Sequence, residues 1–422
     1  MKKYIKNIVP VAALLLTMGT ATSCVGDLDV TPINPNIQTG LNIDGLFNKC
    51  YANFALAGNG GANGDCDIDG IDGGTSGFVR QTFNANELPT DEAICGWGDD
   101  GIAGFCYNSY NASNPMLIGL YARITTGIAY CNQYLAEAGD QDATKLAEIR
   151  FLRAYEYFSL MDGWGNIPFT LQPLTKPERY TRAQVYEWLE KELLEIEPSL
   201  SDAKAKKSTD AGYGRVDKAA CWLLLSRLYL NAEVYTGTPQ WEKAKSYAKK
   251  VMDSSYKLNT KSVNGWSAYQ MLFMGDNGET DAAYEGIFPL LQDGLKTTSW
   301  GTTLFLLAST YDQDMHANPN NPSATNGTDQ AWGGNRARPD LVKKFFPNGN
   351  VPNLESYATA KAAGDDRALF NGVNRSLDND DVATFKSGFG VAKFTNFKTD
   401  GSAGKDATFP DADFFLMRVA EI

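Results

Sequence analysis

The feature that most constrains the fold is a series of helices predicted between residues 118 and 251. In most of these segments apolar residues recur at spacings of three and four, which places them on one helical face, whereas residues 216–230 are apolar nearly all round. The predicted helices occupy residues 118–135, 142–163, 181–196, 216–230 and 241–251. Because the link between the first two is short, we expect these helices to be antiparallel neighbours.

Local signals indicate where some of these helices begin and end. Asp142 can cap the helix that follows it, and Thr181–Gln184 has the pattern of a capping box. The sequence GWG at 163–165, followed by Pro168, predicts a helix end, because glycine adopts left-handed backbone geometry easily and proline prevents resumption. We therefore interpret Trp164 as a packing residue and not as a ligand contact.

The helices together predict a stack of helical hairpins. The last of them, PQWEKAKSYAKKVM, is similar to a tetratricopeptide unit, although the regular 34-residue period is absent. Helices in such an array pack on their neighbours and form a rigid curved scaffold. We therefore predict a mainly α fold in which residues 41–256 form a degenerate tetratricopeptide-like scaffold.

Two long segments lack helical periodicity. Residues 57–115 are rich in Gly, Asn and Asp and are predicted to be a loop region inserted into the scaffold. Residues 257–412 combine loops with short strand-like pieces such as 286–291. Loops this long are either functional or disordered, and the frequent aromatic residues favour order. We predict that residues 257–412 form a loop-rich ligand-binding half.

The N-terminus has the pattern of an export signal. Residues 1–23 contain three lysines, an apolar core too short to span a bilayer, and a run of small residues. The sequence ATSC resembles a bacterial lipobox, with Ala21 where the pattern favours Leu, and predicts lipidation at Cys24. An ordinary cleaved signal with a chance cysteine is the alternative. Residues 24–40 are predicted to be an extended tether.

Composition and motifs argue against several function classes. The formal net charge of −12 argues against non-specific nucleic-acid binding and against docking on anionic lipid, because both need a basic surface. The single histidine, His316, lies in a loop, and no GxSxG motif occurs, so we expect no Ser–His or Cys–His catalytic unit. A hydrolase that uses two carboxylates stays open, because a sequence does not show how far apart two acids lie.

The metal and cysteine patterns are incomplete. Asp65, Asp67 and Asp69 match the first half of a calcium loop, but Ser76 stands where a bidentate Glu is expected; a solvated acidic turn is the alternative. No CxxC motif occurs, which argues against structural zinc. Export permits disulfides, and a bridge would help most in the Gly-rich region, but the connectivity cannot be read from the sequence.

A set of segments, ordered along the whole chain, carries a family resemblance. The segments are Cys24 with DLDVTPINPN, LFNKCYANFALAG, ELPTDEAICGWGDDG, EIRFLRAYEYFSLMDGWGNIPF, GRVDKAACWLLLSRLYLNA, EGIFPL and DFFLMRVAEI. Each is modest alone, but their order is specific. Together they resemble the SusD/RagB family, the surface glycan-binding lipoproteins of gut Bacteroidetes.

The resemblance implies a location, a partner and a way of working. It implies a lipid-anchored protein on the surface of the outer membrane, whose helices pack onto a SusC-like TonB-dependent transporter. The loop-rich half would present a glycan-binding surface, with no bond made or broken and no cofactor. In the family the RVAEI-like stretch opens a further helix pair, so residues 413–422 are predicted to begin a C-terminal helix that is truncated at Ile422.

The candidate ligand contacts are aromatic residues in polar loops, together with polar neighbours that can bond sugar hydroxyls. The family's loop that corresponds to ICGWGDDG often supplies a binding tryptophan, which points to Trp97. For each tryptophan the alternative is a core residue that holds a long loop in place. The predicted contacts are Trp97, Asp99, Asp100, Trp300, Trp332 and Arg336, with Arg338 as a further donor.

We therefore predict a protein that captures oligosaccharide and delivers it to a transporter, and that is not an enzyme. Two alternatives stay open. One is a peptide-binding surface lipoprotein of the same architecture, and the other is a secreted carboxylate-dependent glycosidase.

Overall fold

The computed structural model describes residues 42–58, 61–62, 66–139, 142–321 and 324–422. Residues 46–422 form one compact unit. The predicted export signal, the lipidation at Cys24 and most of the predicted tether lie outside the described residues, as does Asp65. None of the helices in the described ranges has the length and apolar character needed to cross a bilayer.

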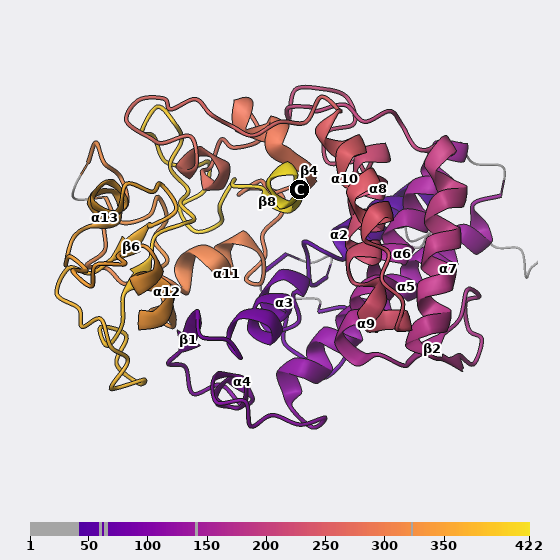
Figure 1. The fold of residues 1–422 in the computed structure, drawn as a ribbon, viewed down its shortest axis with the longest axis horizontal. Coiled ribbons are helices and arrows are strands. Elements are labelled where there is room, and N and C mark those ends of the chain that lie inside the picture. Colours follow the sequence, from indigo (N-terminus) through magenta and orange to yellow (C-terminus); the bar gives the residue numbers. More distant parts are fainter. Residues whose placement is uncertain (1–41, 59–60, 63–65, 140–141, 322–323) are drawn as a thin grey trace, which may run out of the picture. The chain divides into compact units, whose positions relative to one another are not determined.

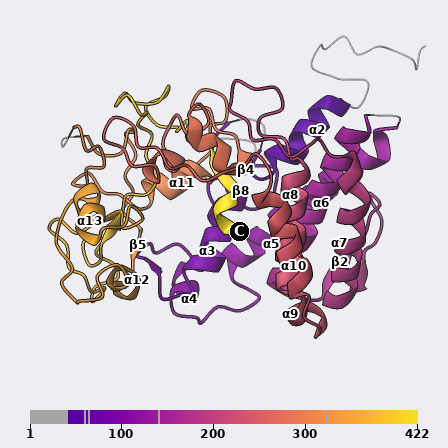
Figure 2. The same cartoon turned by 45° about the horizontal axis from the view of Figure 1, so that its top comes forward.

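A helical array forms one part of this unit, as the sequence predicts (Figures 1 and 2). Its long helices are α5 (Pro115–Glu137), α6 (Ala143–Trp164), α7 (Arg182–Ile196), α8 (Lys218–Leu230) and α10 (Trp241–Met252). Contacts join α5 to α6, α6 to α7, α7 to α8 and α8 to α10. Each helix thus packs on its sequence neighbour, and the mainly α fold class is confirmed.

Side-chain caps begin these helices where the sequence predicts them. The Asp142 carboxylate accepts a hydrogen bond from the backbone N–H of Thr144 at 2.9 Å, and Thr181 and Gln184 form a capping box. At the other end of α6, Gly165 has φ 74°, and its N–H donates to the carbonyl of Met161. The ring of Trp164 packs edge-on against Tyr121 with centroids 5.4 Å apart, in agreement with a packing role.

The predicted loop region 57–115 contains regular secondary structure. It contains α3 (Phe78–Glu87), β1 (Ala93–Cys95) and α4 (Ile102–Cys106), so the prediction of a loop is wrong for these residues. Phe78, Val79 and Gln81 of α3 are buried. The Gly- and Asn-rich sequence around α3 hides its short apolar face from a periodicity argument.

The remaining elements are short and pair over long sequence distances. The strand pairs are all antiparallel: β1 with β5 (Asn335–Ala337), β2 (Ile167–Phe169) with β3 (Glu178–Tyr180), β4 (Gly286–Leu290) with β8 (Phe414–Arg418), and β6 (Phe370–Asn371) with β7 (Gly390–Val391). The other α-helices described are α2 (Ile43–Ala52), α9 (Ala232–Thr236), α11 (Thr303–Ala308), α12 (Pro339–Lys344) and α13 (Ser356–Ala363).

The last ten residues differ from the predicted C-terminal helix. Residues 414–418 form β8, which pairs with β4, and only a single 3₁₀ turn follows at Val419–Glu421 (Figure 2). Phe415 and Met417 are buried on one face of β8, while the residues between them are half-buried. This alternation has the period of a strand, and it accounts for the outcome at 414–418.

The cysteines of the described residues are all unbonded thiols: Cys50, Cys66, Cys95, Cys106, Cys131 and Cys221. Cys95 and Cys106 are neighbours, since the backbone N–H of Cys95 donates to the Cys106 sulfur at 3.4 Å. Burial raises the pKa of the Cys95 thiol to about 12. A buried, protonated thiol of this kind is a packing residue and a poor nucleophile.

Candidate functional site

Three of the predicted residues come together in one aromatic cluster, which we call the tryptophan surface: Trp97, Trp300 and Trp332. The ring centroids of Trp97 and Trp332 are 6.2 Å apart, and those of Trp300 and Trp332 are 6.1 Å apart. Their planes are inclined by 50° and 48°. All three side chains are half-buried. Trp332 therefore stands between the other two rings, and the cluster changes direction from ring to ring.

Strand pairing brings Trp97 beside Trp332. In the β1–β5 pair, Cys95 lies opposite Asn335, and the N–H of Gly96 extends the ladder to the carbonyl of Gly334 at 3.1 Å. The Trp97 indole lies directly on Gly334, because a Cβ added to that glycine would be 2.1 Å from the ring. The space that Gly334 leaves empty is thus the space that Trp97 occupies.

Helix α11 links Trp300 to Trp332. Trp300 lies three residues before α11. The backbone N–H of Trp332 donates to the carbonyl of Ala308, the last residue of α11, at 2.7 Å. The N–H groups of Gly334 and Asn335 both donate to the carbonyl of Ser309 at 2.8 Å. These bonds hold the chain after Trp332 against the end of α11.

Further aromatic rings support the three indoles. Phe305 of α11 packs edge-on against Trp97 at 6.2 Å, and Phe409 packs against Trp300 at 5.1 Å. The indole N–H of Trp332 donates to the side-chain oxygen of Gln330 at 2.8 Å, so the polar edge of this ring already has a partner within the protein. The ring faces, not the indole N–H groups, are therefore what the surface offers.

A charged group at one edge of the cluster was missed by the sequence analysis. The guanidinium of Arg80, on α3, lies 5.5 Å from the Trp97 ring and 3.8 Å from the Asp99 carboxylate. Burial lowers the pKa of Arg80, and the Asp99 carboxylate acts in the opposite direction. Asp99 is 42% exposed and Asp100 is also exposed, so both can accept from a ligand. No sequence signal separates Arg80 from an ordinary helix arginine.

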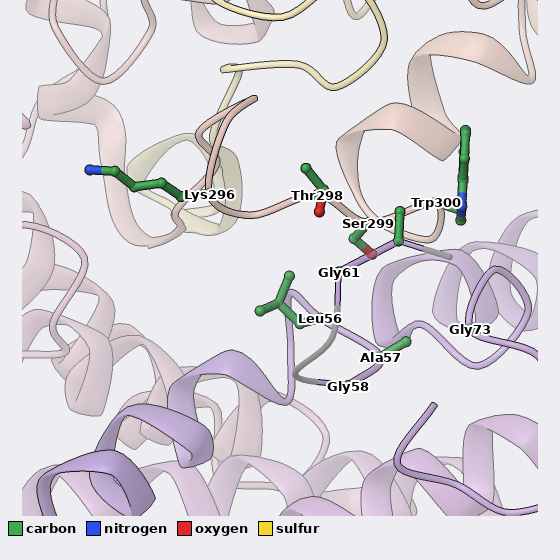
Figure 3. Close-up of a pocket in the computed structure, with 10 residues that line it drawn as sticks. Leu56, Ala57, Gly58, Gly61, Gly73, Lys296, Thr298, Ser299 and Trp300 are labelled. Carbon is green, nitrogen blue, oxygen red and sulfur yellow. The ribbon is translucent and has the colours of Figure 1, made fainter. Parts of the chain in front are cut away.

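A small pocket adjoins the cluster at Trp300. Figure 3 shows Thr298, Ser299 and Trp300 along one loop, with Leu56 and Ala57 on a second loop facing them. Its volume is about 50 Å³, which admits a group the size of one hydroxyl or water but not a sugar ring.

Comparison with known proteins identifies the family. The chain is 37% identical to the starch-binding protein SusD of Bacteroides thetaiotaomicron, over 99% of this chain and 79% of that protein. A family model described as "Starch-binding associating with outer membrane" matches residues 91–230. The chain belongs to the SusD-like family.

Solved structures show the same fold at lower sequence identity. A SusD-like carbohydrate-binding protein from Bacteroides fragilis matches with a TM-score of 0.60 at 17% identity, over 90% of this chain and 72% of that one. A laminarin-binding SusD-like protein matches with a TM-score of 0.59 at 17% identity, over 91% of this chain and 79% of that one. The B. thetaiotaomicron surface glycan-binding protein A, solved with laminarihexaose, matches at 0.57 and 16%, over 90% and 76%. The relative that is 37% identical is named a starch-binding protein, in agreement with the expectation that this chain is not an enzyme.

The guanidinium of Arg336 in this SusD-like chain is buried and bonded to the backbone, so the prediction that it contacts a ligand at the tryptophan surface is wrong. Its side chain is 1% exposed, and its N–H groups donate to four backbone carbonyls, among them Ser387 and Val382, both at 2.6 Å. Arg338 likewise donates to the carbonyls of Ala93 and Cys106, at 2.9 and 2.7 Å. Both arginines anchor loops around the β1–β5 pair.

The predicted calcium site at Asp65, Asp67 and Asp69 is not supported, because the Asp67 carboxylate is bonded to other groups. Asp67 forms ion pairs with Lys49 and Arg123, both at 2.8 Å. Burial alone would raise the pKa of Asp67, but these two cations lower it. Asp69 is exposed, and no group of three or more His, Cys, Asp or Glu residues within the described ranges could hold a metal ion. The carboxylate at Asp67 therefore ties α2 to α5.

Proposed function

We propose that this SusD-like chain is a cell-surface lipoprotein that captures oligosaccharides on the tryptophan surface. The observation that carries the proposal is the convergence of Trp97, Trp300 and Trp332. These rings come from segments more than 30 residues apart in the sequence. In the fold the centroid of Trp332 lies 6.2 Å from that of Trp97 and 6.1 Å from that of Trp300. A half-exposed aromatic cluster with an acidic edge is what a ligand with C–H faces and hydroxyl edges needs.

Stacking supplies the affinity in this proposal. A sugar ring that covers about 100 Å² of apolar surface on one indole gains about 2.5 kcal/mol, before the entropy cost of binding. Successive rings inclined by 50° and 48° suit a chain that turns as it crosses them. Asp99 and Asp100 would accept hydrogen bonds from hydroxyl groups at the Trp97 end.

The relatives suggest which glycans to test first. The names of two of these proteins refer to starch and to laminarin, which are both glucose polymers. We therefore infer that a glucan is the ligand class. Binding without bond cleavage fits the described residues, since His316, the single histidine, pairs with Glu355 outside the cluster.

We also propose that the protein is anchored in the outer membrane by a lipid on Cys24 and hands its ligand to a SusC-like TonB-dependent transporter. The lipobox-like sequence and the family description, which refers to the outer membrane, support this. Cys24→Ala should release the protein from the membrane fraction. Unchanged partitioning of this variant would contradict the anchor.

Calorimetry with maltooligosaccharides and laminarin oligosaccharides tests the binding site. Trp332→Ala removes the central ring and should weaken binding by about 2 kcal/mol, or roughly 30-fold in Kd. Trp241→Ala is the matched control, because Trp241 is 59% exposed on α10, in the helical array. Equal affinity in both variants would overturn the proposed site.

The same experiment separates the alternatives. Thermal unfolding of Trp332→Ala, and of the milder Trp332→Phe, shows whether a loss of affinity reflects a loss of folding. Reducing ends that accumulate on long incubation would indicate a glycosidase. Binding of oligopeptides, with no response to any glycan, would indicate a peptide-binding protein.

A further inference from the structure

A large cavity lies beside α3, apart from the tryptophan surface. Its volume is about 530 Å³, within the range of small-molecule sites. Its walls are mainly aromatic and aliphatic side chains from α3, α11, α12 and three strand pairs, with polar residues such as Asn86, Thr310 and Asn335 among them. They include Phe78, Phe83, Tyr269, Leu306, Leu341, Phe345, Phe370, Phe394, Phe414 and Leu416.

Helix α3 separates this cavity from the tryptophan surface. Phe78, Val79 and Phe83 of α3 line the cavity, while Arg80 on the same helix lies over the Trp97 ring at 5.5 Å. Phe83 packs edge-on against Phe305, which in turn packs against Trp97. A molecule in the cavity would thus touch neither Trp97 nor the other two indoles.

Two cations in the cavity wall have no ion pair with an acid among the described residues, Arg336 and Lys393. The N–H groups of Arg336 are used by four backbone carbonyls, which leaves Lys393 as the cation without a bonded partner. The Lys393 ammonium lies 4.6 Å from the centre of the Phe273 ring, and no hydrogen bond or ion pair joins it to any residue that the structure describes. The other cations nearby are engaged: Arg367 pairs with Asp365 at 2.7 Å, and Arg418 with Glu285 at 3.5 Å. An ammonium held among aromatic rings without a counter-charge is costly.

The acids near Lys393 do not neutralise it. Glu87 and Glu92 line the same cavity, and neither forms an ion pair with Lys393. Burial, and then the nearby Glu92, raise the pKa of Glu87, so this carboxyl holds its proton more readily than usual. Burial lowers the pKa of Lys393 to about 8, with Arg418 acting in the same direction and Glu87 against it.

We propose that this cavity binds a carboxylate with an aliphatic or aromatic body. The apolar body fills the cavity, and the carboxylate pairs with the Lys393 ammonium. Aromatic and aliphatic side chains make up most of the wall, so a sugar in the cavity would leave many of its hydroxyl groups without partners. A carboxylate supplies the missing counter-charge, and an aliphatic or aromatic body fills space that is otherwise costly to leave empty. The site is separate from glycan capture and does not depend on it.

Titration with decanoate tests the proposal, with decan-1-ol as the uncharged analogue. Lys393→Met keeps the length of the side chain and removes the charge. It should weaken decanoate binding by about ten- to a hundredfold and leave decan-1-ol binding unchanged. Lys361→Met is the control, because Lys361 is exposed on α13. 1-Naphthoate, in parallel, separates an aromatic body from an aliphatic one.

A second variant tests the cavity itself. Thr82 is half-buried on α3 and lines the cavity, so Thr82→Trp should fill it and abolish binding of both decanoate and decan-1-ol. Glycan affinity in both variants should match that of the unaltered protein, which separates this site from the tryptophan surface. Equal decanoate affinity in Lys393→Met, or binding that survives Thr82→Trp, would overturn the proposal. The absence of decanoate binding would also overturn the proposal. That result is expected if polypeptide from a partner or a second copy fills the cavity.

Discussion

On α6 and α7 the buried carboxylate of Glu192 accepts from Arg150 at 2.7 Å and from Arg153 at 3.0 Å. In the loop-rich region, the Lys393 ammonium lies among aromatic rings with no such partner among the described residues. The first arrangement is typical of a scaffold, in which each buried charge stabilises the packing of two helices. The second leaves a charge unpaired, which is typical of a place where something else binds.

The largest expected effect comes from the paired charge in the array. Glu192→Met removes the partner of two arginines and should lower the free energy of unfolding by about 3–5 kcal/mol. Burial alone would raise the pKa of Glu192, but the bonds to Arg150 and Arg153 lower it. The stabilisation is thus present above the ordinary carboxyl pKa of 4.5 and is lost as the pH falls through the lowered value.

Urea denaturation from pH 7 down to pH 3 measures this effect. The gap between Glu192→Met and the unaltered protein should narrow in acid. Glu195→Met is the control: Glu195 is on the same helix and also pairs with Arg150, at 3.1 Å, but it is 56% exposed, so its pair contributes at most about 1 kcal/mol. Equal stability of Glu192→Met and Glu195→Met would show that the buried pairs contribute nothing to the array.

The unpaired charge should give the opposite sign. The folded pKa of Lys393, about 8, lies below its ordinary value of 10.5. The protonated form therefore destabilises the folded protein at neutral pH, and Lys393→Met should raise the free energy of unfolding by about 1–3 kcal/mol, discounted for partial exposure. The gain should shrink as the pH rises from 8 and vanish above 10.5. Denaturation curves at pH 7 and pH 10.5 check this; a loss of stability in Lys393→Met would refute it.

A smaller effect is expected at the glycine beneath Trp97. Gly334→Ala places a methyl group where the indole lies, 2.1 Å from the ring, so the ring must move off the cluster. Glycan affinity should fall by about tenfold, or 1.4 kcal/mol. Gly98→Ala is the matched control, since nothing lies within 4 Å of a Cβ built there. Calorimetry on the pair decides whether the position of Trp97 matters or only its presence.

The smallest effect on stability is expected at Asp99, at the edge of the tryptophan surface. Asp99→Asn removes an ion pair to Arg80 that spans 3.8 Å, with the aspartate 42% exposed. Such pairs contribute at most about 1 kcal/mol, so the melting temperature should barely change. A clear drop would show that Asp99 holds Arg80 in place and is not simply available to a ligand.

The sequence predicted the parts of the fold that local signals determine. The capping box at Thr181–Gln184 and the end of α6 at Gly165 are recorded in a few consecutive residues, and both are confirmed. In contrast, α3 was missed because its short apolar face is surrounded by Gly and Asn. The strand at 414–418 was read as a helix because its partner, β4, lies more than 100 residues away.

The candidate site shows the same limit. The loop tryptophans could be chosen by residue type and composition, but nothing in the sequence shows that they meet. Arg336 was chosen on the same basis, yet the backbone carbonyls of residues 381–387 surround it. Arg80 was missed because its role depends on Asp99 and Trp97, which approach it only in the folded chain. Long-range pairing, not local pattern, decides which polar side chains remain available.

Helix α11 lies between Trp300 and the carbonyl that holds Trp332. A helix has a fixed rise per residue, so the spacing of these two rings is set by a rigid element and not by the long loops on either side. Loop residues that do not bond to residues 332–335 can therefore change in sequence while the distance between the two rings stays constant. Related proteins that bind other ligands would then differ in the residues around the rings and keep the same distance between the rings.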